Sequence, residues 1–148
     1  MPLPALSPDA VALGVHAADW RDAVRQVGAA LVRGGAAKPG YAGEMVRMIE
    51  EHGPYVVIAP GLALAHARPG PDVLADGMAV VTLDEPVAFG HPHNDPVSVV
   101  LGLAILSPAG HLESVASLAN VFNDTTAIAE LRDATTVDEV LRIMRDES

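Results

Sequence analysis

The feature that most constrains how this chain can fold is the nearly continuous apolar run of residues 97–106, VSVVLGLAIL. It is about half as long as the roughly 20 residues that a membrane-spanning helix needs. It is rich in β-branched residues and is followed by the turn formers Ser107 and Pro108, which is typical of a strand covered on both faces. We therefore expect a central strand with helices on both sides of its sheet, and no direct insertion into a membrane.

Helical periodicity precedes this run. Trp20, Val24, Val27 and Leu31 recur at the spacing of one helical face, and a pair of glycines ends the pattern. A second helix is predicted to begin at Pro39 and to stop at the sequence HGP. We expect both helices to precede all the strands.

The periodicity then changes to that of strands. Five short runs rich in β-forming residues are separated by Pro, Gly and Asp, at residues 55–61, 62–67, 77–83, 86–90 and 96–107. Three more helices are predicted: one with Leu112 on its buried face, one at 126–131, and one that starts at Thr136 with Glu139 completing a capping box. Since helices do not separate every pair of strands, a mixed sheet is favoured over a doubly wound parallel one. The prediction is an α/β fold, a single-domain sandwich over residues 1–148 with a mixed sheet of about five strands flanked by helices on both faces.

Composition excludes several classes of function. The chain has no cysteine, which excludes thiol nucleophiles, disulfides and thiolate metal sites. Its net charge of -10, with only nine Lys and Arg residues, argues against a nucleic-acid-binding face. The first residues, MPLPALSPDAV, have neither a basic segment nor a following apolar one, so no export signal is recognised and a cytoplasmic protein is expected.

The strongest chemical candidate is the end of the strand in PGLALAHARPG. In an extended strand Leu62, Leu64, His66 and Arg68 share one face, and small alanines line the other. A histidine with a pKa near 6.5 is mostly neutral at cytoplasmic pH and can act as a nucleophile toward a phosphoryl group, whose charge a nearby arginine offsets. The plainer interpretation, which these residues alone leave open, is an edge histidine beside a solvated arginine.

A second histidine-rich stretch, FGHPHNDPV, has two interpretations. Its residues are turn formers, which favours a simple turn. The spacing of His91 and His93 would also suit a zinc site completed by His66 or His111. Pro92 weakens the strand that such a pair needs, and Asp95 is the sole nearby carboxylate, so no metal is the favoured prediction.

A further candidate is His111 in AGHLESV, near the start of a predicted helix. Backbone N–H groups and the helix dipole favour anions there, so His111 could donate to a phosphate; the alternative is an exposed helix-start histidine. His16 and His52 lie at the ends of predicted elements without companion residues and are interpreted as structural.

Three stretches in this order carry a resemblance: GPYVVIAPGLALAHARP, PVAFGHPHNDPV and HLESVASLANVF. The chain resembles the IIA domains of the bacterial phosphoenolpyruvate-dependent sugar phosphotransferase system (PTS), of the mannitol/fructose type. Within them it is most similar to the ascorbate branch. The similarity extends from about Trp20 to the last helix.

The resemblance implies that His66 accepts a phosphoryl group from the histidine-containing phosphocarrier protein HPr and passes it to a cysteine of a separate IIB protein. A separate IIC permease would then carry the sugar, and no cofactor is needed. In the family a second histidine supports the phosphorylated one, and His111 matches it in HLE. Asp95 would lie near the site. HPr and IIB are proteins, so His66 should be partly exposed within an apolar docking surface.

Three positions depart from the family pattern. Ala65 replaces the usual proline before the active histidine, and His91 stands where asparagine is more usual. The phosphate-binding arginine of mannitol and fructose members has no clean match, because Arg47 is about one position away from it. Arg68 is the alternative, as HARP suggests for the ascorbate branch.

The leading hypothesis is therefore a phosphotransferase component that relays phosphoryl groups through His66, supported by His111 and Arg68. A regulatory protein of the same fold, whose phosphorylation state a partner senses, is the alternative. A metal-dependent hydrolase that uses His66, His91, His93 and His111 is the third. The sequence leaves open which sugar is transported and whether the chain forms a homodimer.

Overall fold

The computed structural model describes residues 3–123 and 125–147, with five strands and five helices among them. In chain order the elements are β1 (Leu6–Val15), α1 (Trp20–Arg33), α2 (Gly40–His52), β2 (Val57–Ala59), β3 (Leu62–His66), β4 (Gly77–Val87), β5 (Val97–Ala104), α3 (Pro108–Val121), α4 (Thr125–Asp133) and α5 (Val137–Glu147).

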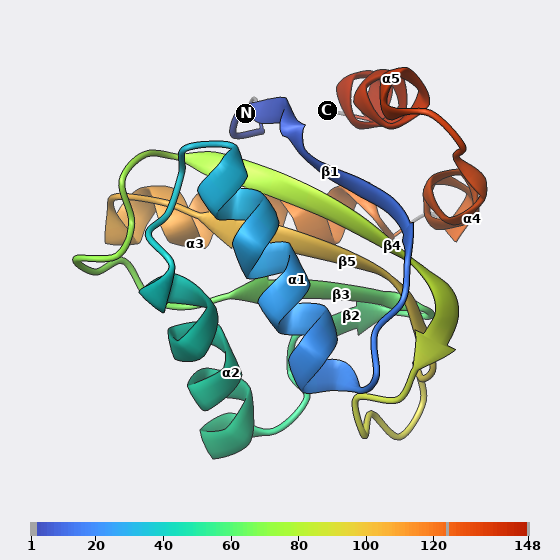
Figure 1. Cartoon of the computed structure of the whole chain (residues 1–148), viewed down its shortest axis with the longest axis horizontal. Coiled ribbons are helices and arrows are strands. Elements are labelled where there is room, and N and C mark those ends of the chain that lie inside the picture. Colours follow the sequence, from blue (N-terminus) through green and yellow to red (C-terminus); the bar gives the residue numbers. More distant parts are fainter. Residues whose placement is uncertain (1–2, 124, 148) are drawn as a thin grey trace.

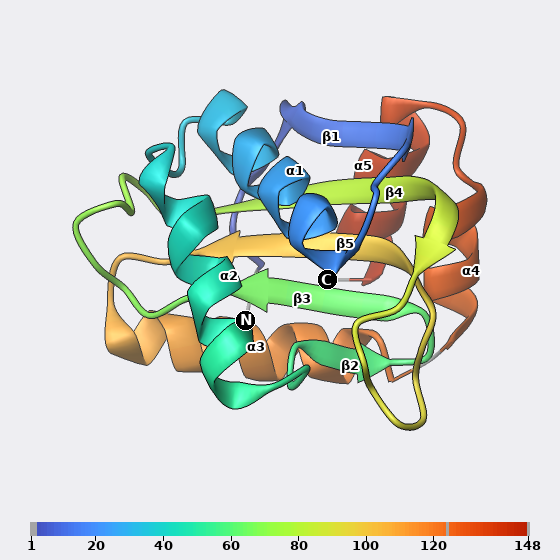
Figure 2. The same cartoon turned by 60° about the horizontal axis from the view of Figure 1, so that its bottom comes forward.

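The strands form one mixed sheet in the order β1-β4-β5-β3-β2. The β1–β4 and β3–β5 pairs are parallel, and the β4–β5 and β2–β3 pairs are antiparallel. Helices α1 and α2 cover one face and α3, α4 and α5 the other (Figures 1 and 2). The predicted fold, a mixed five-stranded sheet flanked by helices on both faces, is confirmed.

The apolar run of residues 97–106 contains β5, which is the middle strand of the sheet and is buried along almost its whole length. The predicted stripe on α1 is also found, since Val24, Val27 and Leu31 are fully buried. Helix α1 ends at the C-cap Gly34, and α2 begins after Pro39, both as expected.

The two faces of β3 differ in the predicted way. Ala63 and Ala65 pack into the core below α1 and α2, and Leu62 and Leu64 pack into the core below α3, α4 and α5. Alternation along the strand therefore directs the last residue, His66, toward the α3 side of the sheet.

Strand β1 was not predicted, and the expectation that two helices precede all the strands is wrong. The segment contains Pro8, Asp9 and Gly14, which argue against a strand. The structure accommodates them because β1 is an edge strand with an irregular register: Leu6 pairs with Met78, but five residues later Val11 pairs with Val80, only two positions further along β4.

Two smaller expectations also fail. Residues 86–90 are not a separate strand, because β4 continues to Val87, which pairs with Val97. In α3 the side chain of Leu112 is 71% exposed, not buried. The helix begins at Pro108, with the Ser107 hydroxyl accepting from the N–H of Gly110. Its buried residues are Ser114 and Leu118, so Leu112 lies on the solvent side.

Candidate active site

His66 is the last residue of β3 and lies at the carboxyl-terminal edge of the parallel β3–β5 pair, where it pairs with Leu103. Its Nδ1 lies 2.8 Å from the carbonyl oxygen of Leu64. A carbonyl can only accept, so Nδ1 carries the proton and the lone pair of the neutral ring is on Nε2. The backbone thus selects the tautomer that leaves the lone pair on Nε2 free.

His111 lies in the first turn of α3, which starts at this same edge of the sheet (Figure 2). The ring centroids of His66 and His111 are 5.1 Å apart, with an angle of 53° between the ring planes. Nδ1 of His111 is buried and has no hydrogen-bond partner among the described residues. The fold therefore brings the two predicted histidines together, although they are 45 residues apart in the sequence.

Burial keeps both rings neutral. It lowers the pKa of His66; the bond to Leu64 opposes this shift, and the nearby His111 adds to it. Burial also lowers the pKa of His111. Both lie below the ordinary value of 6.5, so at neutral pH each ring has a lone pair and neither carries a charge.

Arg68 supplies the positive charge of the site. With His66 and His111 it lines an open hollow of about 410 Å³, completed by Met48, His52 and Tyr55. Among the side chains that the structure describes, no carboxylate is within ion-pair distance of Arg68. Arg47 instead pairs with Glu44 and lines a neighbouring hollow of about 480 Å³. Arg68 lines both hollows, so of the two candidate arginines only Arg68 lines the hollow that contains His66.

Tyr41 fixes the chain immediately after His66. Its buried hydroxyl accepts from the N–H of Ala67 at 3.0 Å and donates to the carbonyl of Leu103 at 2.7 Å. It thus joins the end of β3 to β5 at the position where His66 pairs. The sequence alone gave no sign of this polar role.

The comparisons with known proteins agree on one family. Residues 5–147 match the family model "Phosphoenolpyruvate-dependent sugar phosphotransferase system, EIIA 2". The chain belongs to this family.

Named relatives and solved structures support the same assignment. The ascorbate-specific PTS system EIIA component of Shigella flexneri is 36% identical over 135 residues, covering 90% of this chain and 88% of the relative. The crystal structure of IIA mannitol from Escherichia coli matches with a TM-score of 0.83 and 30% identity, covering 95% of this chain and 99% of that one. A complex of enzyme IIA mannitol with phosphorylated enzyme IIB mannitol from Escherichia coli contains a chain that matches with a TM-score of 0.82 and 28% identity, covering 96% and 98%.

Sequence reasoning missed two residues that line the hollow of His66. His52 was interpreted as structural, but it lines the hollow with His66. Tyr55 was not singled out, but its ring lies edge-on to His66 with centroids 5.5 Å apart. The antiparallel β2–β3 pair brings the start of β2 next to the end of β3, so recognising residues 55–66 as a hairpin would have found Tyr55.

Asp95 is not near the site, and that expectation is wrong. It precedes β5, at the opposite end of the sheet from His66, in the loop that follows β4 (Figure 2). Its carboxylate accepts from the backbone N–H groups of Phe89, Gly90 and His91. Asp95 therefore holds the loop of residues 88–95 in shape.

The histidines of the metal hypothesis are divided between the two ends of the sheet. His91 and His93 lie in the same far loop as Asp95, and Nδ1 of His91 accepts from the N–H groups of His93 and Asn94. Neither can join His66 and His111 in one coordination sphere. Within residues 3–123 and 125–147, no three His, Asp or Glu residues are grouped so that they could hold a metal ion.

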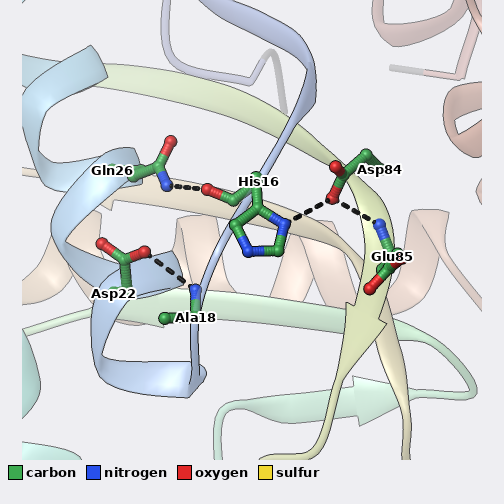
Figure 3. A network of polar contacts seen from close by, with 6 residues as sticks. All are labelled: His16, Ala18, Asp22, Gln26, Asp84 and Glu85. Carbon is green, nitrogen blue, oxygen red and sulfur yellow. Dashed lines mark hydrogen bonds and ion pairs between the residues drawn. The ribbon is translucent and has the colours of Figure 1, made fainter.

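His16 also lies at this far end, and it has a companion that the sequence did not reveal. Figure 3 shows its ring facing Asp84 of β4, with Nδ1 3.3 Å from the carboxylate oxygen. Its carbonyl accepts from the side chain of Gln26, which ties the β1–α1 connection to the helix. This network supports the fold and is separate from the site of His66.

No helix in the described part of the chain is long and apolar enough to span a membrane.

Proposed function

We propose that this EIIA protein, acting as one domain over residues 1–148, is the cytoplasmic phosphocarrier of a PTS for ascorbate or a related sugar. It accepts a phosphoryl group from phospho-HPr on Nε2 of His66 and passes it to a cysteine of a IIB protein. The observation that carries the proposal is the juxtaposition in one hollow of a neutral His66 with its Nε2 lone pair available, His111 and Arg68.

The transfer needs no metal and no other cofactor. The Nε2 lone pair attacks phosphorus, the new N–P bond forms, and the phosphohistidine of HPr keeps the electron pair of the bond that breaks. The product is an imidazolium whose Nδ1–H still points at the Leu64 carbonyl, which stabilises its positive charge. Arg68 and His111 bind the phosphoryl oxygens in this proposal, which their position in the same hollow as His66 supports. A IIB thiolate then attacks phosphorus, and Nε2 recovers its lone pair.

The surface around His66 suits docking of proteins. Four large apolar side chains are exposed in the described part of the chain, Tyr55, Leu74, Leu106 and Leu112. Tyr55 precedes β2, Leu74 precedes β4, Leu106 follows β5 and Leu112 is the fifth residue of α3. The start of α3 and the chain segments after β3 and β5 lie at one edge of the sheet (Figure 2). The IIA–IIB complex among the structural matches supports a IIB partner, and the ascorbate-specific relative supports the substrate class.

The test is an intact-mass assay with phosphoenolpyruvate, enzyme I and HPr. We expect one acid-labile phosphoryl group on the wild-type protein and none on His66→Ala. His93→Ala, a histidine substitution at the far end of the sheet, should be labelled like the wild type. An unlabelled wild-type protein, or a fully labelled His66→Ala, would overturn the proposal.

Adding the IIB protein of an ascorbate system then separates transport from regulation. We expect IIB to discharge the labelled wild-type protein. If IIB leaves the label in place, the chain is a regulatory protein whose phosphorylation state a partner senses.

A further inference from the structure

Tyr55 has an unusual position for a half-exposed aromatic residue. The residue is 40% exposed, yet its ring contacts two imidazoles. It lies edge-on to His66, with centroids 5.5 Å apart and planes at 86°, and edge-on to His52, with centroids 6.3 Å apart and planes at 80°. Edge-to-face contacts of this kind restrict the orientation of a ring.

Tyr55 belongs to the same hollow as Arg68, His66 and His111. Tyr55 and Arg68 are close enough for the charge of Arg68 to lower the pKa of Tyr55. Burial is the larger influence and raises that pKa above 10.0, so the hydroxyl keeps its proton at neutral pH. No hydrogen bond of this hydroxyl is found among the described residues. It is therefore a donor without a partner in the described part of the chain, on a residue that lines the hollow of His66.

The two tyrosines of the chain differ in this respect. The Tyr41 hydroxyl is buried and is bonded to the backbone on both sides, at Ala67 and Leu103. Its role is structural. The Tyr55 hydroxyl makes no bond of this kind. A phosphoryl group on His66 would need hydrogen-bond donors, because it has three strong acceptor oxygens.

We infer that Tyr55 is a phosphoryl-binding residue of this site, and that its hydroxyl donates to an oxygen of the phosphoryl group carried by Nε2 of His66. The inference rests on the proposed function. Arg68 follows β3 and His111 lies on α3. Tyr55, which precedes β2, adds a third donor to the hollow from a third segment of the chain. The hydroxyl makes this bond only in the phosphorylated protein, so it stabilises that state over the unphosphorylated one.

The measurement that tests this is the equilibrium constant for phosphoryl exchange between phospho-HPr and the chain. This constant depends only on the free energies of the separate proteins in their phosphorylated and unphosphorylated states. A change in the affinity of the two proteins for each other therefore leaves it unaltered. The distinction is needed because Tyr55 also belongs to the exposed apolar surface. A hydrogen bond to a charged group contributes enough to change an equilibrium by about tenfold or more. We expect Tyr55→Phe, which keeps the ring, to shift the exchange toward phospho-HPr by about that factor.

Leu112→Ala is the matched control, because Leu112 is exposed on the same surface and has no polar group. We expect it to slow the approach to equilibrium without moving the end point. An unchanged end point for Tyr55→Phe, with or without a slower rate, would overturn the inference and make Tyr55 a docking residue. If the wild-type protein takes no label at all, the proposed function itself fails, and that outcome is distinct.

Discussion

Replacing Tyr41 by phenylalanine tests how the end of β3 is held. The substitution keeps the buried ring and removes one oxygen. The N–H of Ala67, a residue 3% exposed, loses its partner, and so does the carbonyl of Leu103. A buried donor left unsatisfied costs about 1–3 kcal/mol and the lost bond to the carbonyl about 1 kcal/mol. We expect the free energy of unfolding to fall by about 3 kcal/mol.

Urea denaturation monitored by circular dichroism measures this change, with Tyr55→Phe as the control. The same oxygen is lost there from a half-exposed position, so the unphosphorylated protein should change by less than about 0.5 kcal/mol. Tyr41→Phe should also slow phosphorylation of His66, because the backbone after the histidine loses its link to β5. A loss of stability below about 0.5 kcal/mol for Tyr41→Phe would refute this account of the strand end.

Alkaline pH provides a second readout of the same hydroxyl. Burial raises the pKa of Tyr41 to about 12 from 10.0. Between these values the unfolded chain has lost the proton and the folded chain has not, so stability falls as the pH rises. The slope is about 1.4 kcal/mol per pH unit, or roughly 3 kcal/mol over the interval. Tyr41→Phe lacks this loss, so the stabilities of the two proteins should converge toward pH 12; parallel curves would contradict the assignment.

Two further predictions concern the core and the site. In Gly102→Ala the new Cβ would lie 2.8 Å from a valine methyl group of α1, and we expect overpacking to lower the unfolding free energy by about 1–3 kcal/mol. The control Gly43→Ala, on α2 with no atom within 4 Å, should instead be neutral or stabilising; equal effects would exclude packing as the cause. The pKa of His66 and that of His111 are lower in the folded protein than the 6.5 of the unfolded chain. The unfolded chain therefore binds protons first, and the free energy of unfolding should decrease as the pH falls from 6.5 through the pKa values of the folded protein. His111→Gln should reduce this acid dependence in urea titrations, and an unaltered slope would show that His111 does not contribute.

Much of the fold was predictable because its determinants are local. The stripe on α1, its terminal glycines and the start of α2 at Pro39 follow from side-chain spacing and backbone preference. Strand β1 was not predictable in this way, since Pro8 and Asp9 are tolerated only at the irregular edge of a sheet. The exposure of Leu112 was missed for a similar reason: packing of α3 on the sheet decides which of its faces is buried, and that face contains Ser114 and Leu118.

The site shows the same division. His66 and Arg68 were recognised from one strand, and His111 from the start of one helix. Placing them in a single hollow required the parallel pairing of β3 with β5, which sends both chain segments to the same edge. Tyr55 enters this hollow through the antiparallel β2–β3 pair, and Asp95 is excluded because it lies before β5 and not after it.

The sequence by itself determined the class of fold, the absence of thiol chemistry and a histidine at the end of a buried strand, because composition, periodicity and turn formers act within a few residues. Only the tertiary structure decided which nitrogen of His66 keeps a free lone pair, which arginine lines the hollow beside it and which histidines lie together. These depend on the carbonyl of Leu64 and on the order of the strands. Such contacts join residues that are distant in the chain, and only the folded sheet fixes their distances.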